Sequence, residues 1–425
     1  MTRCNLGFAL AVTAAASPRL DPTTAFAPIP RLTSIVPTTL AVGGAVGRGR
    51  TGLSPPERFA ALGPGIAEAP AAPTQGAEAV SPWNWRGHNI YHEVTPAAAP
   101  TSSAAFPSWT NILGGVGGRG PREKPAVLLI HGFGASTVYW RSTTEALSTA
   151  GYDVHSLDLL GQGRSAKPGD VYYSTELWAE MVDDYAREFV GEEGGNKGVV
   201  LMGNSLGSVV ALAAATGESV GAGGSGFLSE PGRVRGLCLY NCGIGMNSKN
   251  IINDPRFGPI QQTLLRTLFS ILETLLFNRL VLGYALGNIV TPDLLRKALI
   301  SLYKNDPGRV DDELVESFYR PAKDIGAAEA LRQIYTNDAG PTPMELHKRH
   351  GEVLGARVPI QLVWGDEDVV TPLDEVVGKF YQGLAADPGR KVDLEVVRAG
   401  HVPFDDNPED SNGVMLRWLE ATVIR

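Results

Sequence analysis

The chain has 425 residues and a formal net charge of −8, from 45 acidic and 37 basic side chains. The acidic balance argues against a nucleic-acid-binding protein, three cysteines are too few for a disulfide scaffold, and no uninterrupted apolar stretch is long enough to predict a membrane span. Of the 50 Gly and 30 Pro, 15 Gly and 16 Pro lie in the first 125 residues, so this part is expected to differ from the rest.

The N-terminal 80 residues have the composition of a targeting region. A basic residue precedes the apolar run 6–16, which is typical of a signal peptide, and the segment 22–56 has Arg, Ser and Thr but no acidic residue, which is typical of a transit peptide. The sequence Thr-Ala-Phe-Ala-Pro at 24–28 resembles the cleavage motif of bipartite presequences in algae with secondary plastids. This resemblance implies cleavage before Phe26 and a plastid location, with secretion as the alternative. Residues 1–80 are therefore predicted to be presequence and disordered linker.

The folded part is predicted to begin with a strand over Trp83–Tyr91, followed by a Pro-, Ala- and Gly-rich loop insertion at 95–125. The insertion contains Gly115–Gly120, a literal G-x-G-x-x-G, but no strand precedes it and prolines follow it, so we expect no dinucleotide or other cofactor. Beyond it, short apolar runs alternate with helical patterns, which predicts an α/β fold with a mostly parallel central sheet and flanking helices. The expected strands are Val127–Ile130, Val154–Leu159, Val199–Met202, Val234–Tyr240, Ile360–Trp364 and Val392–Val397.

The segment 245–350 interrupts this alternation because it contains helical patterns and no clear strand. It is predicted to be a helical cap inserted between a first core segment, 81–244, and a second, 351–425. Residues 260–290 within it are apolar on most faces, which we interpret either as core packing or as the lining of an apolar substrate pocket. Charged residues interrupt this run, so no membrane span is predicted, and peripheral membrane contact through the cap is kept as an option.

A nucleophile is predicted where the expected strand Val199–Met202 runs into Gly203-Asn204-Ser205-Leu206-Gly207 and a helical pattern follows. This G-x-S-x-G arrangement is typical of a nucleophile elbow, a strand-to-helix turn too tight for a Cβ at the glycine positions. We therefore expect Gly203 and Gly207 to be required by the turn, and Ser205 to be the nucleophile.

A serine hydroxyl needs a general base, and the base needs an acid that orients it. Asp368 and His401 follow the last two expected strands. Because the carboxyl ends of parallel strands share one edge of a sheet, we predict that Ser205, Asp368 and His401 converge there. Asp366 is the competing acid, although its position favours a role in capping the turn.

The loop His131-Gly132-Phe133-Gly134, after the first parallel strand, is predicted to complete the site. The backbone N–H groups of Phe133 and Leu206 are expected to form an oxyanion hole, and Gly132 to let the loop approach the elbow closely. His131 is interpreted as a structural residue that orients this loop.

The remaining polar candidates are interpreted as solvated surface. They are Asp405, Asp406 and the run His347-Lys348-Arg349-His350. No H-E-x-x-H pattern is present, so we expect no metal site.

These segments together resemble the α/β-hydrolase superfamily, in its cap-bearing, serine-nucleophile branch. The matching segments are 129–136, 139–141, 158–165, 203–207, 364–372 and 400–403. The resemblance implies an α/β-hydrolase fold with a Ser-His-Asp triad. A narrower resemblance, through 203–207, 312–316 with 320–321, and 400–403 before 407–409, is to plastid hydrolases that include pheophytinase and chlorophyll dephytylase. It implies a phytyl-type ester substrate, and chlorophyll degradation as the process.

The predicted function is that of a serine esterase that acts on a lipid-like or isoprenoid carboxylic ester through an acyl-enzyme. One alternative keeps the same triad but cleaves a C–C, thioester or amide bond. Another is a ligand receptor on the same fold without turnover. The expected partner is a small apolar ester, and no nucleic acid is expected.

Overall fold

The computed structural model describes residues 78–79, 82–98, 124–191, 198–218, 226–247, 249 and 258–424. Nearly all of the predicted presequence 1–80, and most of the predicted insertion 95–125 with its Gly115–Gly120 motif, therefore lie outside the described residues. The boundaries proposed for core and cap remain predictions.

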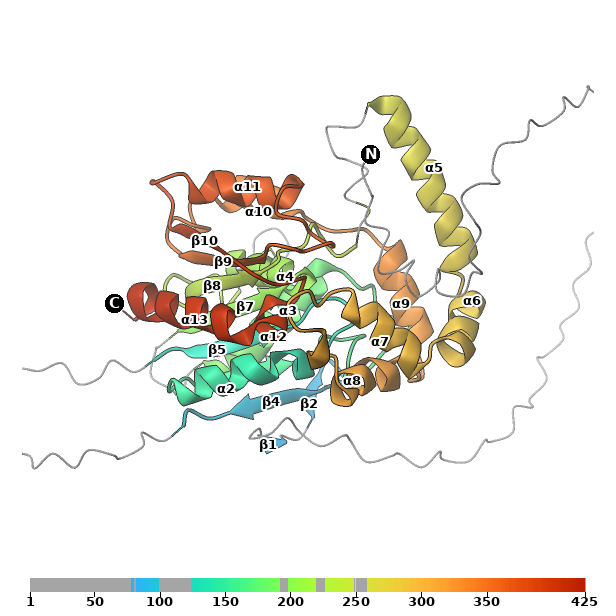
Figure 1. Cartoon of the computed structure of the whole chain (residues 1–425), viewed down its shortest axis with the longest axis horizontal. Coiled ribbons are helices and arrows are strands. Elements are labelled where there is room, and N and C mark those ends of the chain that lie inside the picture. Colours follow the sequence, from blue (N-terminus) through green and yellow to red (C-terminus); the bar gives the residue numbers. More distant parts are fainter. Residues whose placement is uncertain are drawn as a thin grey trace, which may run out of the picture. The chain divides into compact units, whose positions relative to one another are not determined.

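An eight-stranded sheet forms the centre of the described chain, in the order β1-β4-β6-β5-β7-β8-β9-β10 (Figure 1). In this order, the six strands β6, β5, β7, β8, β9 and β10 pair in parallel, whereas β4 pairs antiparallel with both β1 and β6. The predicted mostly parallel sheet is thus confirmed. The strands are β1 (Glu78–Ala79), β4 (His92–Thr95), β5 (Ala126–Ile130), β6 (Val154–Leu157), β7 (Val199–Asn204), β8 (Val234–Tyr240), β9 (Ile360–Gly365) and β10 (Val392–Val397).

Helices cover both faces of this sheet, as expected for strands that are buried on both sides. One apolar core joins the sheet to α3 (Thr175–Tyr185), α4 (Leu206–Thr216), α10 (Pro343–His350) and α11 (Val376–Ala385). The other joins it to α2 (Arg141–Thr149), α13 (Pro408–Trp418) and two helices inserted between β8 and β9, α7 (Pro292–Ile300) and α8 (Asp312–Ala322). Successive residues of β5 alternate between the two cores, with Val127 and Leu129 in one and Leu128 and Ile130 in the other.

The segment Trp83–Tyr91 does not form the single strand that we expected. It folds into β2 (Trp83–Trp85) and β3 (His88–Ile90), which pair antiparallel as a separate two-stranded sheet. Arg86 and Gly87 connect them with φ values of 52° and 85°. Two consecutive residues with positive φ are typical of a tight hairpin turn, and this turn breaks the strand.

Most helices between β8 and β9 lie together beside the sheet, at the right of Figure 1, whereas α10 lies next to α11. The group beside the sheet includes α5 (Pro259–Leu276), α6 (Arg279–Tyr284), the π-helical turn Ala285–Ile289 and α9 (Ala327–Thr336), besides α7 and α8.

The apolar excess of residues 260–290 was expected to be core or pocket lining. This was wrong for much of the segment, because eight large apolar side chains of 260–284 are exposed. Among the described residues, no single helix is long and apolar enough to cross a membrane, but α5 and Arg279–Ile289, bent by 57°, reach that length and composition together.

Buried histidines make the stability of this fold depend on pH. His347 of α10 was interpreted as solvated, but it is buried against the rings of Phe380 and Tyr381 on α11. Burial, with a smaller effect of Arg390, lowers the pKa of His347 to about 4.

As the pH falls, the unfolded chain, with a histidine pKa of about 6.5, takes up this proton before the folded protein does. The folded state therefore loses stability between the unfolded and the folded pKa. When the pH is lowered from 7 to 4.5, the free energy of unfolding should fall in both proteins. We expect the fall to be smaller in His347→Gln than in the wild type, by on the order of 2 kcal/mol. Urea unfolding at the two pH values measures this difference, and equal losses would contradict it.

Candidate active site

Five neighbouring strands end at the same edge of the sheet and place the candidate residues there. In the pairing register, Ile130 of β5 lies beside Gly203 of β7, Asn204 beside Tyr240 of β8, and Val397 of β10 beside Gly365 of β9. The residues that follow these strand ends are therefore brought together although they are far apart in the sequence. They are His131, Ser205, Asn241, Asp368 and His401.

Ser205 stands on a sharp turn between β7 and α4. Its φ of 52° and ψ of −116° are unusual for a residue with a side chain, and its N–H donates to the carbonyl of Tyr240 at 3.0 Å. A Cβ at Gly203 would collide with the carbonyl of Gly207, and one at Gly207 with the carbonyl of Ile130. Backbone strain of this kind costs of order 1–3 kcal/mol and persists only where the surroundings impose it. The two glycines are thus required by close packing, as predicted for the turn.

His401 and Asp368 form a buried pair. The Nδ1 atom of His401 lies 3.0 Å from both carboxylate oxygens of Asp368, and both residues are less than 10% exposed. Burial alone raises the pKa of Asp368, but His401, Thr371 and Asn241 outweigh it, and the pKa is lowered. Asp368 is therefore an anion that holds the imidazole of His401 through Nδ1.

Asp366, the competing acid, is exposed and accepts a hydrogen bond from the backbone N–H of Ala399 at 3.0 Å. It holds the segment that leads to His401, whereas the contact with the imidazole itself belongs to Asp368.

The loop after β5 lies against the elbow. A Cβ on Gly132 would be 3.0 Å from Oδ1 of Asn204 and 3.4 Å from Cβ of Ser205, so a glycine allows this approach. Gln162 accepts the N–H of Gly134 at 2.6 Å. Within the described part of the chain, the N–H groups of Phe133 and Leu206 have no hydrogen-bond partner. These are the two amides predicted for the oxyanion hole.

His131 supports this loop with both ring nitrogens. Its Nε2 accepts the N–H of Leu159 at 2.9 Å, so the proton is on Nδ1, which donates to the carbonyl of Gly132 at 2.7 Å. Burial lowers the pKa of His131 and keeps it neutral. This geometry fits the interpretation of His131 as a residue that orients the loop.

The model of the alpha/beta hydrolase family matches residues 127–412, which include the parallel strands, apart from the first residue of β5, and all the candidate residues described above. The chain belongs to the alpha/beta hydrolase family.

Other comparisons agree with this assignment. An uncharacterised protein of Mycobacterium tuberculosis is 27% identical over 301 residues, which cover 70% of this hydrolase and 76% of that protein. The probable lysophospholipase BODYGUARD 3 of Arabidopsis thaliana is 34% identical over 99 residues, 23% of this chain and 19% of that protein. The crystal structure of a putative acyltransferase from Salmonella enterica has a TM-score of 0.55 at 18% identity, over 83% of this chain and 98% of that one, and shows the same fold.

Asn241 is a site residue of this hydrolase that the sequence analysis missed. Its side-chain amide donates to Asp368 and, at 3.3 Å, to the carbonyl of Gly400, and its Oδ1 accepts the N–H of Gly365 at 3.1 Å. It thus joins the loop of the acid to the loop of the histidine. Its position directly after the predicted strand Val234–Tyr240 was the available signal, since strand ends carry the other candidates too.

Asp405 and Asp406 are not solvated, as we had expected, but completely buried. Asp405 accepts from Arg141 at 3.1 Å, Arg309 at 2.8 Å and Tyr303 at 2.6 Å. Among the described residues, the carboxylate of Asp406 accepts hydrogen bonds from backbone N–H groups only. Buried carboxylates are tolerated where hydrogen bonds replace water, and a sequence pattern cannot show that such partners will be present.

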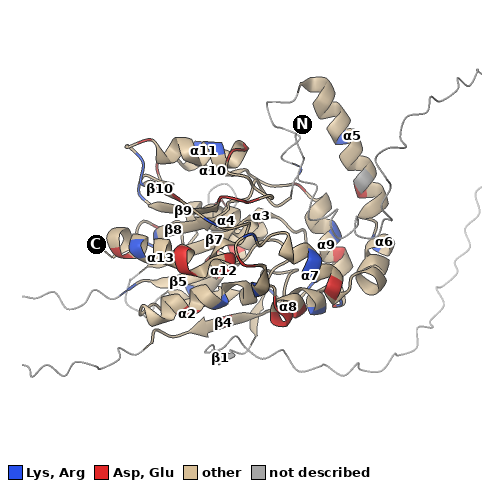
Figure 2. Cartoon of the chain, in the orientation of Figure 1, with Lys and Arg blue, Asp and Glu red and all other residues tan. Residues whose placement is uncertain are grey.

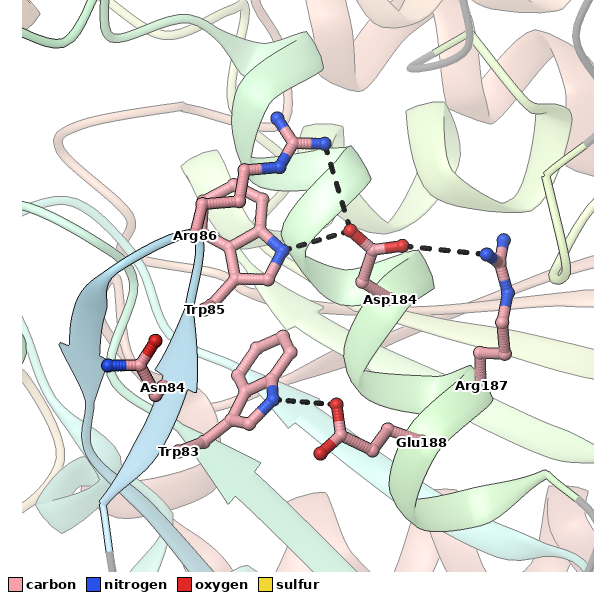
Figure 3. A pocket seen from close by; sticks show the side chains of 7 residues that line it. All are labelled: Trp83, Asn84, Trp85, Arg86, Asp184, Arg187 and Glu188. Carbon is pink, nitrogen blue, oxygen red and sulfur yellow. Dashed lines mark hydrogen bonds and ion pairs between the residues drawn. The ribbon is translucent and has the colours of Figure 1, made fainter.

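A pocket of about 260 Å³ on the hydrolase lies away from these residues, between the β2–β3 hairpin and α3 (Figure 3). Its polar groups bind each other: the indole N–H of Trp83 donates to Glu188 at 2.8 Å and that of Trp85 to Asp184 at 2.9 Å. These contacts attach the hairpin to α3 and to the π-helical turn Ala186–Val190 that follows it. In the described part of the chain, no group of three or more His, Cys, Asp or Glu side chains could hold a metal ion.

We expect Asn241→Leu to slow the reaction of Ser205 with a serine-directed phosphonate by roughly 10- to 100-fold, because Asp368 and the His401 loop lose a common partner. The matched control is Asn412→Leu, since Asn412 is a buried asparagine that contacts Thr143 and Ser142 on α2. Labelling rates measured by mass spectrometry compare the two variants. Equal rates would show that Asn241 has no special part in the site.

Proposed function

We propose that this alpha/beta hydrolase is a serine esterase. The observation that carries the proposal is the buried His401–Asp368 pair at the strand ends beside a serine held on a strained turn. Ser205 attacks the ester carbonyl while Nε2 of His401 removes the hydroxyl proton, and anionic Asp368 stabilises the imidazolium. The amides of Phe133 and Leu206 donate to the oxyanion. His401 then protonates the departing alcohol, and water, activated by His401, releases the acid from the acyl-enzyme.

The proposed substrate is a lipid-like ester, with a phytyl-type alcohol as the specific candidate. Support comes from the apolar character of 260–290 and from the sequence resemblance to phytyl ester hydrolases. A relative that matches over 23% of the chain is named a probable lysophospholipase, which also acts on a lipid ester. Delivery to a plastid through residues 1–80 belongs to the same proposal.

Ser205→Ala is expected to reduce ester turnover by roughly 1,000-fold or more and to abolish phosphonate labelling, because the nucleophile is removed. Ser229→Ala is the matched control, since the Ser229 hydroxyl only caps a turn through the carbonyl of Gly226. Undiminished labelling of the Ser205→Ala protein would exclude Ser205 as the nucleophile.

The substrate class is tested with esters whose alcohols increase in length from methyl to phytyl, with pheophytin and chlorophyll beside them. We expect kcat/KM to rise with the length of the alcohol because the added apolar surface is removed from water. A maximum at acetyl esters of short alcohols would contradict a lipid-like substrate.

A further inference from the structure

Helices α5 and α6 carry a continuous row of exposed apolar side chains. On α5 these residues follow one another at intervals of four, four, three and four, so they share one face of the helix. With the exposed apolar residues of α6, their exposure lies between 44% and 86%. We call this set the apolar stripe, and it consists of Ile260, Leu264, Leu268, Ile271, Leu275, Leu280, Val281 and Tyr284.

The opposite side of α5 faces the rest of the cap. Glu273 forms an ion pair with Lys249 at 2.6 Å, and Phe277, just beyond the helix, packs against Tyr335 of α9 at 4.4 Å between ring centroids. Arg266 and Glu273 are the charged residues of α5, which is otherwise uncharged in Figure 2. A helix with apolar residues on both sides is expected to be covered on both sides, and large exposed apolar patches mark contact surfaces.

Three hydroxyl groups of α5 are satisfied within the helix itself. The hydroxyls of Thr263, Thr267 and Thr274 donate to backbone carbonyls four residues earlier, at 2.8 to 3.0 Å. Such groups need no hydrogen bond from water, which is the condition for placing a helix in a lipid environment. A protein partner, by contrast, is recognised through polar groups that remain available at the rim of the contact.

Backbone groups at the helix ends are also hydrogen-bonded by side chains. Gln261 accepts the N–H of Gly258 at 2.8 Å, and Asn278 accepts the N–H of Leu280 at 2.8 Å. At the far end, Lys323 donates to the carbonyls of Leu286, Gly287 and Val290. Side chains thus bind backbone groups that a helix otherwise leaves to water. This favours hydrocarbon over a second protein surface as the environment of the stripe.

An aromatic path connects α5 to the candidate site. Phe277 contacts Tyr335, and Tyr335 contacts Phe133 of the oxyanion loop edge-to-face at 5.2 Å. The surface that we assign to a lipid environment and the loop beside Ser205 are therefore joined by apolar contacts.

We propose that the apolar stripe docks this protein on the surface of a lipid bilayer. The further statement, that the site takes its apolar ester from that bilayer along the aromatic path, rests on the esterase function proposed above.

The test is co-sedimentation of the full chain with phosphatidylcholine vesicles. The stripe variant combines Leu264→Gln, Leu268→Gln and Leu275→Gln, which change exposed positions and leave the packed side of α5 intact. The matched control combines Tyr172→Gln, Ile325→Gln and Val396→Gln, three exposed apolar residues outside the stripe. Both variants keep the N-terminal apolar run, so any vesicle contact of that run is the same in each.

We expect the wild type and the control variant to bind, and the stripe variant to bind roughly 100-fold more weakly. Binding should persist in 1 M salt, where charge attraction is screened beyond about 3 Å. Equal binding of the two variants, or no binding of the wild type, would overturn the proposal. A wild-type dimer that the stripe variant disrupts, without vesicle binding, would assign the stripe to a second copy of the chain.

Hydrolysis of a water-soluble short-chain ester separates this proposal from the esterase function. The stripe variant should keep the wild-type rate on that ester. Vesicle binding through the stripe without any ester turnover would refute the esterase and leave the docking surface standing.

A second inference comes from Asp406, whose buried carboxylate joins two separate segments. It accepts the N–H of Gly400 at 2.7 Å, next to His401, and from the cap the N–H groups of Lys304 at 2.9 Å, Asn305 at 3.0 Å and Asp306 at 2.8 Å. The N–H of His401 donates to the carbonyl of Leu302 at 2.9 Å, which adds a second link between the same segments. A carboxylate that accepts several backbone N–H groups fixes their relative positions.

We infer that Asp406 is a positioning residue that couples the cap to the loop of His401. Asp405 is the natural comparison, because it is equally buried but binds the side chains of Arg141, Arg309 and Tyr303 and not the loop of His401.

The test compares amide hydrogen exchange in Asp406→Asn and Asp405→Asn. In Asp406→Asn, we expect exchange to accelerate at least about tenfold in both 302–306 and 399–402, because an NH2 group, itself a donor, replaces one of the two oxygens that accept backbone N–H groups. In Asp405→Asn, segment 399–402 should exchange at the wild-type rate. Equal exchange of 399–402 in the two variants would overturn the inference.

If Asp406→Asn does not fold, Asp406→Glu, which keeps the charge but displaces it by one methylene, undergoes the same comparison. Kinetics add a readout that depends on the esterase function: kcat on a soluble ester should fall more than KM changes in the Asp406 variant. Because hydrogen exchange needs no turnover, an inactive wild type would refute the esterase without deciding the role of Asp406.

Discussion

The turn at Ser205 is the constraint around which the described chain is arranged. A residue with a side chain at φ 52° is unfavourable by itself, and it persists because β7 and α4 are both buried and leave no other path between them. The tightness of the turn excludes a Cβ at Gly203 and Gly207. It also puts α4 so close to the end of β5 that the loop from His131 to Gly134 must pass directly over the elbow.

Polar groups around the elbow are held by partners that the neighbouring strands supply. Asp368 would be costly to bury alone, and hydrogen bonds from His401, Thr371 and Asn241 offset this cost and keep it ionised. Because Asn241 comes from β8 and Asp368 from the loop after β9, the order of the strands places the acid. The histidine depends further on the cap, through Asp406 and the carbonyl of Leu302.

The inserted helices differ in what they contact: some pack on the sheet, whereas α5 leaves apolar side chains exposed. Helices α7 and α8 close one apolar core of the sheet, and α9 brings Tyr335 against the oxyanion loop. Helix α5 contributes little to either core and leaves its apolar stripe exposed, while its hydroxyls bind its own backbone. The same insertion therefore links the candidate site to the surface proposed to meet a bilayer.

Much of the architecture follows from local patterns in the sequence. Apolar runs and helical periodicity predicted the parallel strands, and glycine spacing around Ser205 predicted the elbow, because a tight turn restricts the residues on both sides of it. The order of Ser205, Asp368 and His401 then predicted which strand ends should meet. The hairpin at Arg86–Gly87 was missed because it also needs a positive φ at Arg86, and a residue other than glycine does not signal this in advance.

Burial of individual polar residues was decided by the tertiary structure alone. Asp405, Asp406 and His347 have the sequence character of surface residues, and their burial depends on donors and rings from distant segments. Asn241 gained its partners in the same way. The exposure of α5 is the converse case, since an apolar composition predicts that a helix will be covered but does not identify what covers it. Composition and spacing act along the chain and are visible in the sequence, whereas partners across the fold exist only once the strands are ordered.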